Sequence, residues 1–574
     1  MIPLAFDGVM ARLHPADPAK ASGLGVVIVP PHGLEALAAA KSLRLLAEAL
    51  AARGYAVLRF DLPGTGDSLG TDTEPGRVEA WTASIAAAAR QLTVHAGVTG
   101  IVLLGLRLGA LLAARAAPTV PQLAGLALLD PVMRGRTYTR ELMITARAVA
   151  EGARLDPEAT STPSGLSIGG LLTSSATLDA MKELDLARLP APSAPVLVLH
   201  RKGAIDAAAI GKAWTATVVT AEEAAGFEAI GLSPTVAVTP RAAIDRAGAW
   251  IDTLPRRERK TDIVPTPARL EGPDFVEEAV MFGPDNRLFG ITCQPTATGT
   301  DPMLLIVNAG RNPHIGWARG AVTLARRLAA EGIASFRMDV GGVGDGADRP
   351  GAADRLDQVL YHPDLLADVS AALDRLEAGG YPRAALMGAC SGAHLALHSA
   401  AADPRVEGLV LVNIQRFVWR EGETVEQAIA SSYAVASSYV SKLWDLKAWG
   451  KILSGERSLT PLVFEFARRL MARARGFVPS AETRAARALM AKLDQRKVPV
   501  ELVYSDDDAG LEELARHFGA RGRRLARMPQ VRFDTIPDTD HDLTPEAARE
   551  ALFVRTLAAA RTWGDPPQGL RSKA

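Results

Sequence analysis

The chain carries the same series of short segments twice, in the same order. The first copy runs through GLGVVIVPPHG (23–33), AVLRFDLPGTGDS (56–68) and GIVLLGLRLGALLAARAA (100–117). The second runs through PMLLIVNAGRN (302–312), ASFRMDVGGVGDG (334–346) and RAALMGACSGAHLALHSAA (383–401). The offset between the copies is nearly constant, which indicates an internal duplication. The chain is therefore expected to fold as two similar halves.

Each copy alternates short apolar runs with longer stretches of helical period. The runs VVIVP, AVLRF, IVLLG and VLVLH are rich in β-branched and aliphatic residues, and the stretches between them are rich in Ala, Leu and Arg. Strands that alternate with helices indicate an α/β fold, with a mostly parallel sheet flanked by helices.

A segment rich in charge and proline separates the two copies. The sequence LPRRERKTDIVPTPARLEGP (254–273) lacks periodic apolar residues, which is typical of a linker. We expect a first domain at 1–258, a linker at 259–273 with the boundary near residue 262, and a second domain at 274–574.

Composition excludes several classes of protein. Of the 574 residues 48% are hydrophobic, which is enough for sizeable cores. The 64 basic residues balance 64 acidic ones, so no nucleic-acid partner is expected. Only two cysteines are present, which is compatible with a reducing compartment. The N-terminus MIPLAFDGVMARLHP does not resemble a signal peptide, and no apolar run is long enough to span a bilayer. A cytoplasmic protein is expected.

One turn in the second copy has the pattern of a nucleophile elbow. Gly388 and Gly392 flank Cys390 at minus two and plus two, between an expected strand and an expected helix. Small neighbours are needed there because the central residue occupies a strained turn. We interpret Cys390 as a nucleophile, with the N–H of Ser391 in the oxyanion hole. Two alternatives are a buried structural cysteine and Ser391 as the nucleophile.

An acid and a histidine follow in the chain order that such a nucleophile requires. The segment VPVELVYSDDDAG (498–510) is expected to be a strand followed by a turn that offers Asp506, Asp507 and Asp508. Asp508 is the preferred candidate, and His541 follows the last expected strand as the base. The alternative for His541 is a solvated loop histidine.

The oxyanion loop is expected after the first strand of the second copy. Backbone N–H groups near Ala309 and Gly310 are candidates to face the developing negative charge. The nearby Arg311, His314 and Arg319 are alternatively ordinary solvated charges.

Two regions without strand signals interrupt the halves, at 130 to about 190 and at 413 to about 495. They are expected to be helical or loop-like insertions, the second either a lid over a pocket or packed onto its own domain. The second insertion holds the large aromatic residues Trp419, Tyr433, Tyr439, Trp444 and Trp449.

No metal or cofactor site is expected. The GVGDG and GTGDS turns lack the lysine and the spacing of a phosphate loop. His394 and His398 are four residues apart on the expected helix after Cys390, but no glutamate accompanies them as in a zinc-protease motif.

Together these motifs resemble the α/β-hydrolase superfamily over most of the chain. The resemblance rests on Gly388-Ala-Cys-Ser-Gly392, on the turns Asp61–Asp67 and Asp339–Asp345, and on the segments around Asp508 and His541. It implies two tandem hydrolase domains, each with an eight-stranded, mostly parallel sheet and helical lid insertions. Within the superfamily the second half is similar to the serine-aminopeptidase-like branch, with cysteine in place of serine as in dienelactone hydrolases.

The first half departs from this pattern. Arg107 stands at its elbow, where arginine cannot act as an acyl-accepting nucleophile, and no histidine falls in the expected place near 226–234. This half is expected to be catalytically silent. Arg107 is either a ligand anchor for a carboxylate or phosphate, or an arginine salt-bridged to a neighbour such as Asp61 or Asp67.

The favoured function is an acyl hydrolase, an esterase or thioesterase, acting through Cys390, His541 and Asp508 and an acyl-enzyme. The expected substrate is a small-molecule or carrier-bound acyl ester or thioester. The alternatives are an acyltransferase that uses the same acyl-enzyme and a non-catalytic binding or scaffold protein.

Overall fold

The two copies of the sequence fold into two sheets of matching strand order. The computed structural model describes residues 1–203, 207–259, 268–297, 302–349, 359–420, 423–425 and 479–563. The first sheet has the order β1-β2-β4-β3-β5-β6-β10-β11 and the second the order β12-β13-β14-β16-β15-β17-β18-β19-β20. In the N-terminal half, the part with the first sheet, β2 is antiparallel to both of its neighbours, β1 and β4, and the other strands pair in parallel. In the C-terminal half β14 is likewise antiparallel to both of its neighbours, β13 and β16. The expected fold class, a mostly parallel sheet in each half, is confirmed.

The strands of the first sheet are β1 (Ile2–Phe6), β2 (Val9–His14), β3 (Leu24–Val29), β4 (Ala56–Phe60), β5 (Gly100–Leu106), β6 (Leu123–Leu129), β10 (Val196–His200) and β11 (Val219–Glu223). Those of the second are β12 (Arg269–Glu271), β13 (Phe275–Phe282), β14 (Leu288–Pro295), β15 (Met303–Ile306), β16 (Ser335–Asp339), β17 (Ala384–Ala389), β18 (Val406–Val412), β19 (Val500–Ser505) and β20 (Val531–Ile536).

Helices cover both faces of each sheet, so the central strands are buried along their whole length. In β3, Val26 packs against α1 (Leu34–Ala52) and α7 (Arg241–Ile251), and Val27 packs on the opposite side with α2 (Arg77–Ala96) and α3 (Leu108–Ala116). The C-terminal half repeats this division: α8 (Gly320–Ala330) and α17 (Glu546–Ala560) cover one face, and α9 (Leu365–Ala378), α10 (Ser391–Ala402) and α15 (Ala481–Gln495) the other. Alternate residues of a buried parallel strand face opposite helix layers, which explains the continuous apolar runs.

The C-terminal sheet has one strand more than the expected eight. The extra strand, β12, is three residues long and pairs with the edge strand β13. It falls inside the segment expected to be a linker, because Leu270 is buried there against the edge of the sheet. The boundary expected near residue 262 lies outside the described residues.

The insertion of the N-terminal half contains strands that were not expected. Between α4 (Gly135–Gly152) and α5 (Ser175–Lys182), a small sheet is formed by β7 (Ser161–Thr162), β8 (Gly165–Ile168) and β9 (Leu171–Ser174). The expectation that 130–190 lacks strands is wrong, since strands of two to four residues carry too few alternating positions to be detected. We call this insertion, residues 135–182, the cap of the N-terminal half.

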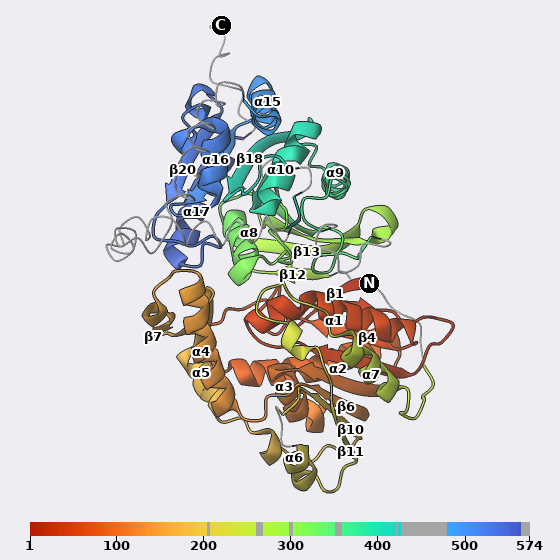
Figure 1. Cartoon of the computed structure of the whole chain (residues 1–574). Coiled ribbons are helices and arrows are strands. Elements are labelled where there is room, and N and C mark those ends of the chain that lie inside the picture. The colour runs from red at the N-terminus through yellow and green to blue at the C-terminus, as the bar shows by residue number, and fades with distance from the viewer. Residues whose placement is uncertain are drawn as a thin grey trace, which may run out of the picture.

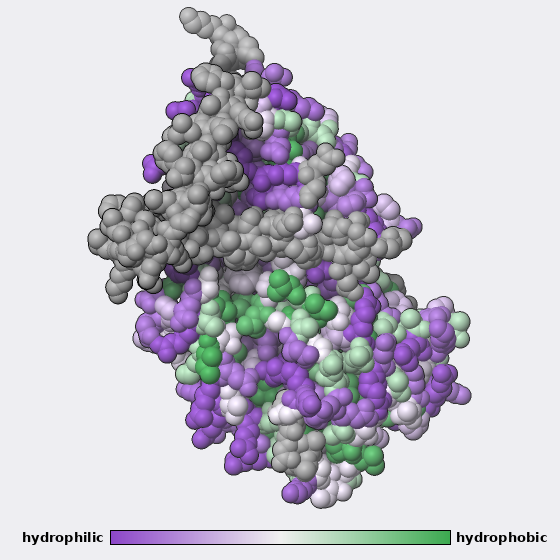
Figure 2. Space-filling view, in the orientation of Figure 1, coloured by the Kyte–Doolittle hydropathy of each residue, from purple (hydrophilic) through white to green (hydrophobic). Residues whose placement is uncertain are grey.

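The two halves are stacked, with β1, β12 and β13 at the junction (Figure 1). Met10 of the N-terminal half shares an apolar cluster with Leu270, Phe289 and Ile291 of the C-terminal half. On the face seen in Figure 2, hydrophobic residues of the N-terminal half also gather close to the junction. Within the described residues, no helix is both long and apolar enough to cross a membrane.

Equivalent turns of the two halves meet at this junction. In the first turn Asp61 Oδ2 accepts a hydrogen bond from the N–H of Asp67 (3.0 Å), and in the second Asp339 Oδ2 accepts one from the N–H of Asp345 (2.9 Å). The two turns therefore share one internal geometry, as their matching Asp–Asp spacing predicts.

Reciprocal ion pairs join the two turns. Arg59 Nη2 lies 2.6 Å from Asp345 Oδ1, and the equivalent Arg337 Nη2 lies 3.1 Å from Asp67 Oδ1. Arg12 adds a third cation that contacts Asp67 at 2.6 Å and Asp345 at 2.8 Å. These groups are almost entirely buried, so removing one partner leaves an uncompensated charge in the interface.

His314 bridges the halves at the centre of this network. Its Nδ1 lies 2.7 Å from Asp339 Oδ2, and its Nε2 lies 2.7 Å from Asp67 Oδ2 of the N-terminal half. Burial opposes its charge, but Asp67 and Asp339 raise the pKa of His314 to about 10. The interface therefore holds an imidazolium ion at neutral pH.

This imidazolium predicts a pH-dependent stability. Because the pKa of His314 is higher in the folded protein than its ordinary 6.5, its contribution is fully present below pH 6.5 and is lost as pH rises toward about 10. Urea unfolding midpoints of wild type and His314→Gln should therefore differ most at low pH and converge near pH 10. The control is His362→Gln, which removes the partly exposed His362–Asp364 pair. The difference between its unfolding midpoint and that of wild type should not shrink as pH rises. A difference that is constant with pH would contradict the prediction.

Candidate active site

Cys390 lies at a sharp turn between β17 and α10. Its backbone has φ 54° and ψ −119°, and its N–H donates to Val412 O at 3.0 Å. A Cβ at Gly388 would collide with the backbone of Gly392, and one at Gly392 would collide with the backbone oxygen of Asn308. The G-x-C-x-G pattern is thus explained by close backbone approaches around a positive-φ residue.

Asp508 and His541 meet at the carboxyl ends of β19 and β20. The His541 Nδ1–H donates to Asp508 Oδ2 at 2.6 Å. Asp508 is buried, and its other oxygen accepts from Gln415 Nε2 at 2.6 Å and from the Gly510 N–H at 2.7 Å. The carboxylate is thereby fixed in one orientation toward the imidazole.

The structure distinguishes the three neighbouring acids. Asp506 and Asp507 are exposed, whereas Asp508 is buried against His541. Asn413 Nδ2 donates to the backbone oxygen of His541 at 2.8 Å and so holds the loop in place.

Electrostatic coupling connects His541 to Cys390. Burial would lower the pKa of His541, but the Cys390 side chain, followed by Asp508, raises it well above its usual value. Tyr361 belongs to the same group of side chains, because burial and then Cys390 raise the pKa of its hydroxyl. The tyrosine ring is stacked on Trp419 at 4.5 Å.

This coupling predicts a measurable shift in the His541 titration. In Cys390→Ala the pKa of His541 should fall, because the substitution removes the neighbour that raises it most. NMR titration of the ring resonances measures this change. Cys293→Ala is the matched control, since Cys293 is the other cysteine and is buried in β14. Identical His541 titrations in wild type and Cys390→Ala would show that the two side chains do not interact.

The expected oxyanion residues Ala309 and Gly310 lie in the loop after β15. Ala309 lines the cavity in front of the cysteine, whereas the Gly310 N–H donates to Ser391 Oγ at 3.0 Å. The loop is anchored by Asn308, whose Nδ2 donates to Asp339 Oδ1 at 2.8 Å. The interface residue Asp339 therefore also supports the loop beside the cysteine.

Ser391 has a structural partner in this arrangement. It is the first residue of α10, is mostly buried, and uses its Oγ to accept from Gly310. Within the described residues, Ser391 Oγ makes no hydrogen bond to His541. By contrast, the Cys390 side chain is coupled to His541 and raises its pKa.

Arg107 occupies the equivalent turn of the N-terminal half with the same backbone geometry, φ 53° and ψ −120°. Its guanidinium lies 2.8 Å from Glu35, 2.8 Å from Glu141 and 3.5 Å from Asp130. The partners suggested from the sequence, Asp61 and Asp67, instead bind Arg12. This site is filled by its own ion pairs.

Three residues of the site were not found from the sequence: Tyr361, Asn413 and Gln415. Asn413 and Gln415 directly follow β18, so their position at the carboxyl end of a parallel strand was a usable signal. Tyr361 belongs to a loop and carries no such signal. Of the expected lid, Tyr433, Tyr439, Trp444 and Trp449 lie outside the described residues.

One described group has the composition of a metal site. His314, Asp339 and Asp345 bring their ligand atoms within 4.8 Å of one another. However, both His314 nitrogens contact carboxylates, and Asp345 is paired with Arg12 and Arg59. Protein cations already balance these acids, so a metal ion is not needed to explain the group.

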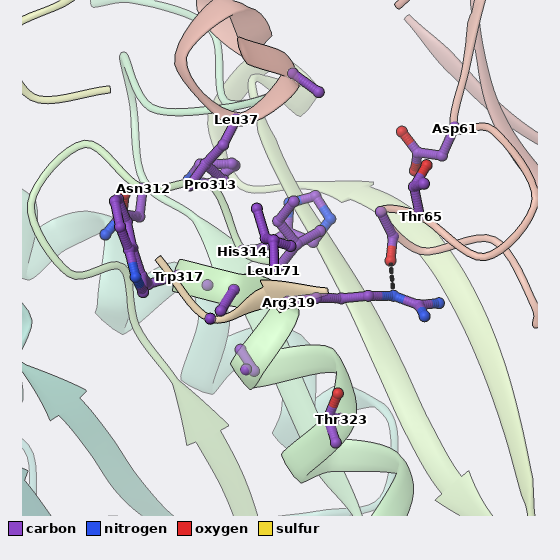
Figure 3. Close-up of a pocket in the computed structure, with 18 of the residues that line it drawn as sticks. Leu37, Asp61, Thr65, Leu171, Asn312, Pro313, His314, Trp317, Arg319 and Thr323 are labelled. Carbon is purple, nitrogen blue, oxygen red and sulfur yellow. Dashed lines mark hydrogen bonds between the residues drawn. The ribbon is translucent and has the colours of Figure 1, made fainter. Parts of the chain in front are cut away.

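Cys390 and His541 open into a cavity of about 710 Å³. Its other walls come from both halves, as the labelled residues Leu37, Leu171, His314 and Trp317 illustrate (Figure 3). The volume lies in the range of sites that enclose small organic ligands.

Family models match a segment of each half. Residues 26–156 match the family described as serine aminopeptidase, S33, and residues 304–555 match the family described as alpha/beta hydrolase family. No curated protein matches the chain.

The solved structures that the chain resembles include esterases and a putative dienelactone hydrolase. A cold-adapted esterase from an Arctic intertidal metagenomic library is 16% identical with a TM-score of 0.30, over 51% of this chain and 97% of the esterase. Est1E from Butyrivibrio proteoclasticus, with ferulic acid bound, is 17% identical with a TM-score of 0.32, over 44% of this chain and 98% of its own. A putative dienelactone hydrolase from Klebsiella pneumoniae subsp. pneumoniae MGH 78578 is 15% identical with a TM-score of 0.32, over 50% of this chain and 99% of its own.

Proposed function

Since this chain belongs to the α/β-hydrolase superfamily and is an enzyme of that type, we propose that its C-terminal half is an esterase or thioesterase that works through an acyl-enzyme on Cys390. The observation that carries the proposal is the buried Asp508 that holds His541, together with the raised pKa of His541 beside Cys390. A histidine with a raised pKa next to a cysteine favours a thiolate–imidazolium pair.

In the first step the thiolate sulfur of Cys390 attacks the carbonyl carbon of the ester or thioester. The carbonyl electron pair moves to oxygen, and the N–H groups of Ala309 and Ser391 are the proposed donors to that oxyanion. When the intermediate collapses, the carbon–oxygen or carbon–sulfur bond to the leaving group breaks. His541 gives its proton to the departing alcohol or thiol.

In the second step water resolves the acyl-enzyme. His541 takes a proton from water, the hydroxide attacks the Cys390 thioester, and the carboxylic acid leaves as the sulfur regains its electron pair. Asp508 keeps His541 in the tautomer that both steps need.

Intact-mass spectrometry of the full chain with a panel of activated acyl esters and thioesters tests this mechanism. One acyl adduct is expected in wild type and Ser391→Ala, none in Cys390→Ala, and a longer-lived one in His541→Ala. Addition of alcohol or amine acceptors then separates hydrolysis from acyl transfer. An adduct that survives in Cys390→Ala, or none with any donor, would overturn the proposal.

A further inference from the structure

The cavity that contains Cys390 is lined on one side by the N-terminal half of the chain. Trp81, Leu171 and Thr173 of the N-terminal half line the same space as Cys390 and His541. Arg107 is absent from the described residues that line this space. The Arg107 turn of the N-terminal half is therefore occupied by its own ion pairs. Trp81, Leu171 and Thr173 of the same half instead line the cavity that contains Cys390.

The tip of the hairpin of β8 and β9 in the cap packs against the C-terminal half. Its tip, Gly169 and Gly170, has positive φ values of 56° and 85°. A Cβ at Gly169 would lie 2.9 Å from the Trp317 ring, and one at Gly170 would lie 3.0 Å from the backbone oxygen of Thr544. Thr544 is three residues beyond His541, so the hairpin packs directly on the segment that follows the proposed base.

Hydrogen bonding and ring contacts hold this wall in place. His32 Nε2 lies 2.9 Å from Thr173 Oγ1, and the His32 ring lies 5.1 Å from the Trp81 ring. Burial lowers the pKa of His32 to about 4, so the imidazole is neutral near pH 7 and places no charge on the wall. From the other side, Ile315 and Trp317 pack against the core of the N-terminal half.

We propose that the N-terminal half is the acyl-binding wall of the active site, with Leu171 of the cap as a specificity-determining residue, and that the substrate carries an extended apolar acyl chain. This inference rests on the proposed acyl-enzyme at Cys390. An acetyl group would leave most of the about 710 Å³ cavity unfilled. Each further methylene that enters an apolar wall is expected to raise kcat/KM by about fourfold, until the cavity is full.

Acyl chain-length profiles of the full-length enzyme test the inference. The measured quantity is the ratio of kcat/KM for octanoyl over acetyl thioesters in wild type, Leu171→Trp and Leu171→Ala. Leu171→Trp should lower this ratio at least tenfold, because the larger ring occupies the space of the acyl chain. Leu171→Ala should shift the acyl length with the highest kcat/KM to dodecanoyl. Met143→Trp is the matched control, since Met143 lies on α4 of the same cap but is 49% exposed. Its ratio should equal that of wild type.

The outcomes separate this inference from the proposed function. If Cys390 is acylated but the three chain-length profiles coincide, the wall does not select the acyl chain and the inference is overturned while the function stands. If no donor acylates Cys390, the function fails, and calorimetric binding of octanoate to the intact protein tests the cavity on its own. Binding that weakens at least tenfold in Leu171→Trp, but not in Met143→Trp, supports the acyl-binding wall, and equal affinities overturn it.

Discussion

Replacement of Cys390 by alanine is expected to lower kcat/KM for ester or thioester cleavage by about 10⁴-fold or more. The reason is chemical: the substitution removes the sulfur that accepts the acyl group in the proposed mechanism, so residual activity comes from binding and the oxyanion donors. Steady-state kinetics on the full chain, with the donor that acylates wild type best, measures the loss.

The second cysteine supplies the control for this experiment. Cys293 lies in β14, where burial followed by Glu277 raises the pKa of its thiol to about 12. Cys293→Ala should therefore keep the wild-type kcat/KM. Activity within tenfold of wild type in Cys390→Ala would assign the nucleophile to another residue, with Ser391 the next to be replaced.

The second large effect is expected at Asp508. Asp508→Asn preserves the shape of the side chain but leaves one acceptor oxygen in place of two. That oxygen cannot accept from His541 Nδ1–H while also accepting from Gln415 and Gly510. The wrong histidine tautomer is then favoured, and kcat should fall by about 10³- to 10⁴-fold with a smaller change in KM. The pKa of His541 should fall as well, because Asp508 is one of the groups that raise it.

Asp507→Asn is the matched control for Asp508→Asn. Asp507 is adjacent in the sequence but exposed, so its replacement should leave kcat unchanged. Equal losses in the two variants would mean that the charge of the turn as a whole, and not the bond to His541, supports catalysis.

The parts of this structure that depend on local pattern could be predicted from the sequence. The strained turn at Cys390 requires small residues two positions away on each side, so the glycine spacing, together with the expected strand before it and helix after it, indicated the turn. Asp508 follows a buried strand by a few residues, and the carboxyl ends of parallel strands converge. Such constraints act over a few residues and are visible without any tertiary contact.

The parts that depend on how the halves dock could not be predicted. Solvated charge was one alternative for His314, but the residue is buried and contacts Asp67 of the other half. Asp67 was a suggested partner for Arg107, yet the interface occupies it, and Glu35 and Glu141 take its place. Each of these contacts joins residues far apart in the chain, so no local pattern specifies it.

The reciprocal pairs Arg59–Asp345 and Arg337–Asp67 have the form of an isologous contact, in which one patch binds its own copy. Such a contact belongs to a symmetric dimer, where every substitution appears twice and alters both active sites at once. Once both copies are encoded in one chain, each site mutates alone. The duplicated chain can thus carry Arg107 at one turn and Cys390 at the equivalent turn, while the reciprocal ion pairs still join its two halves.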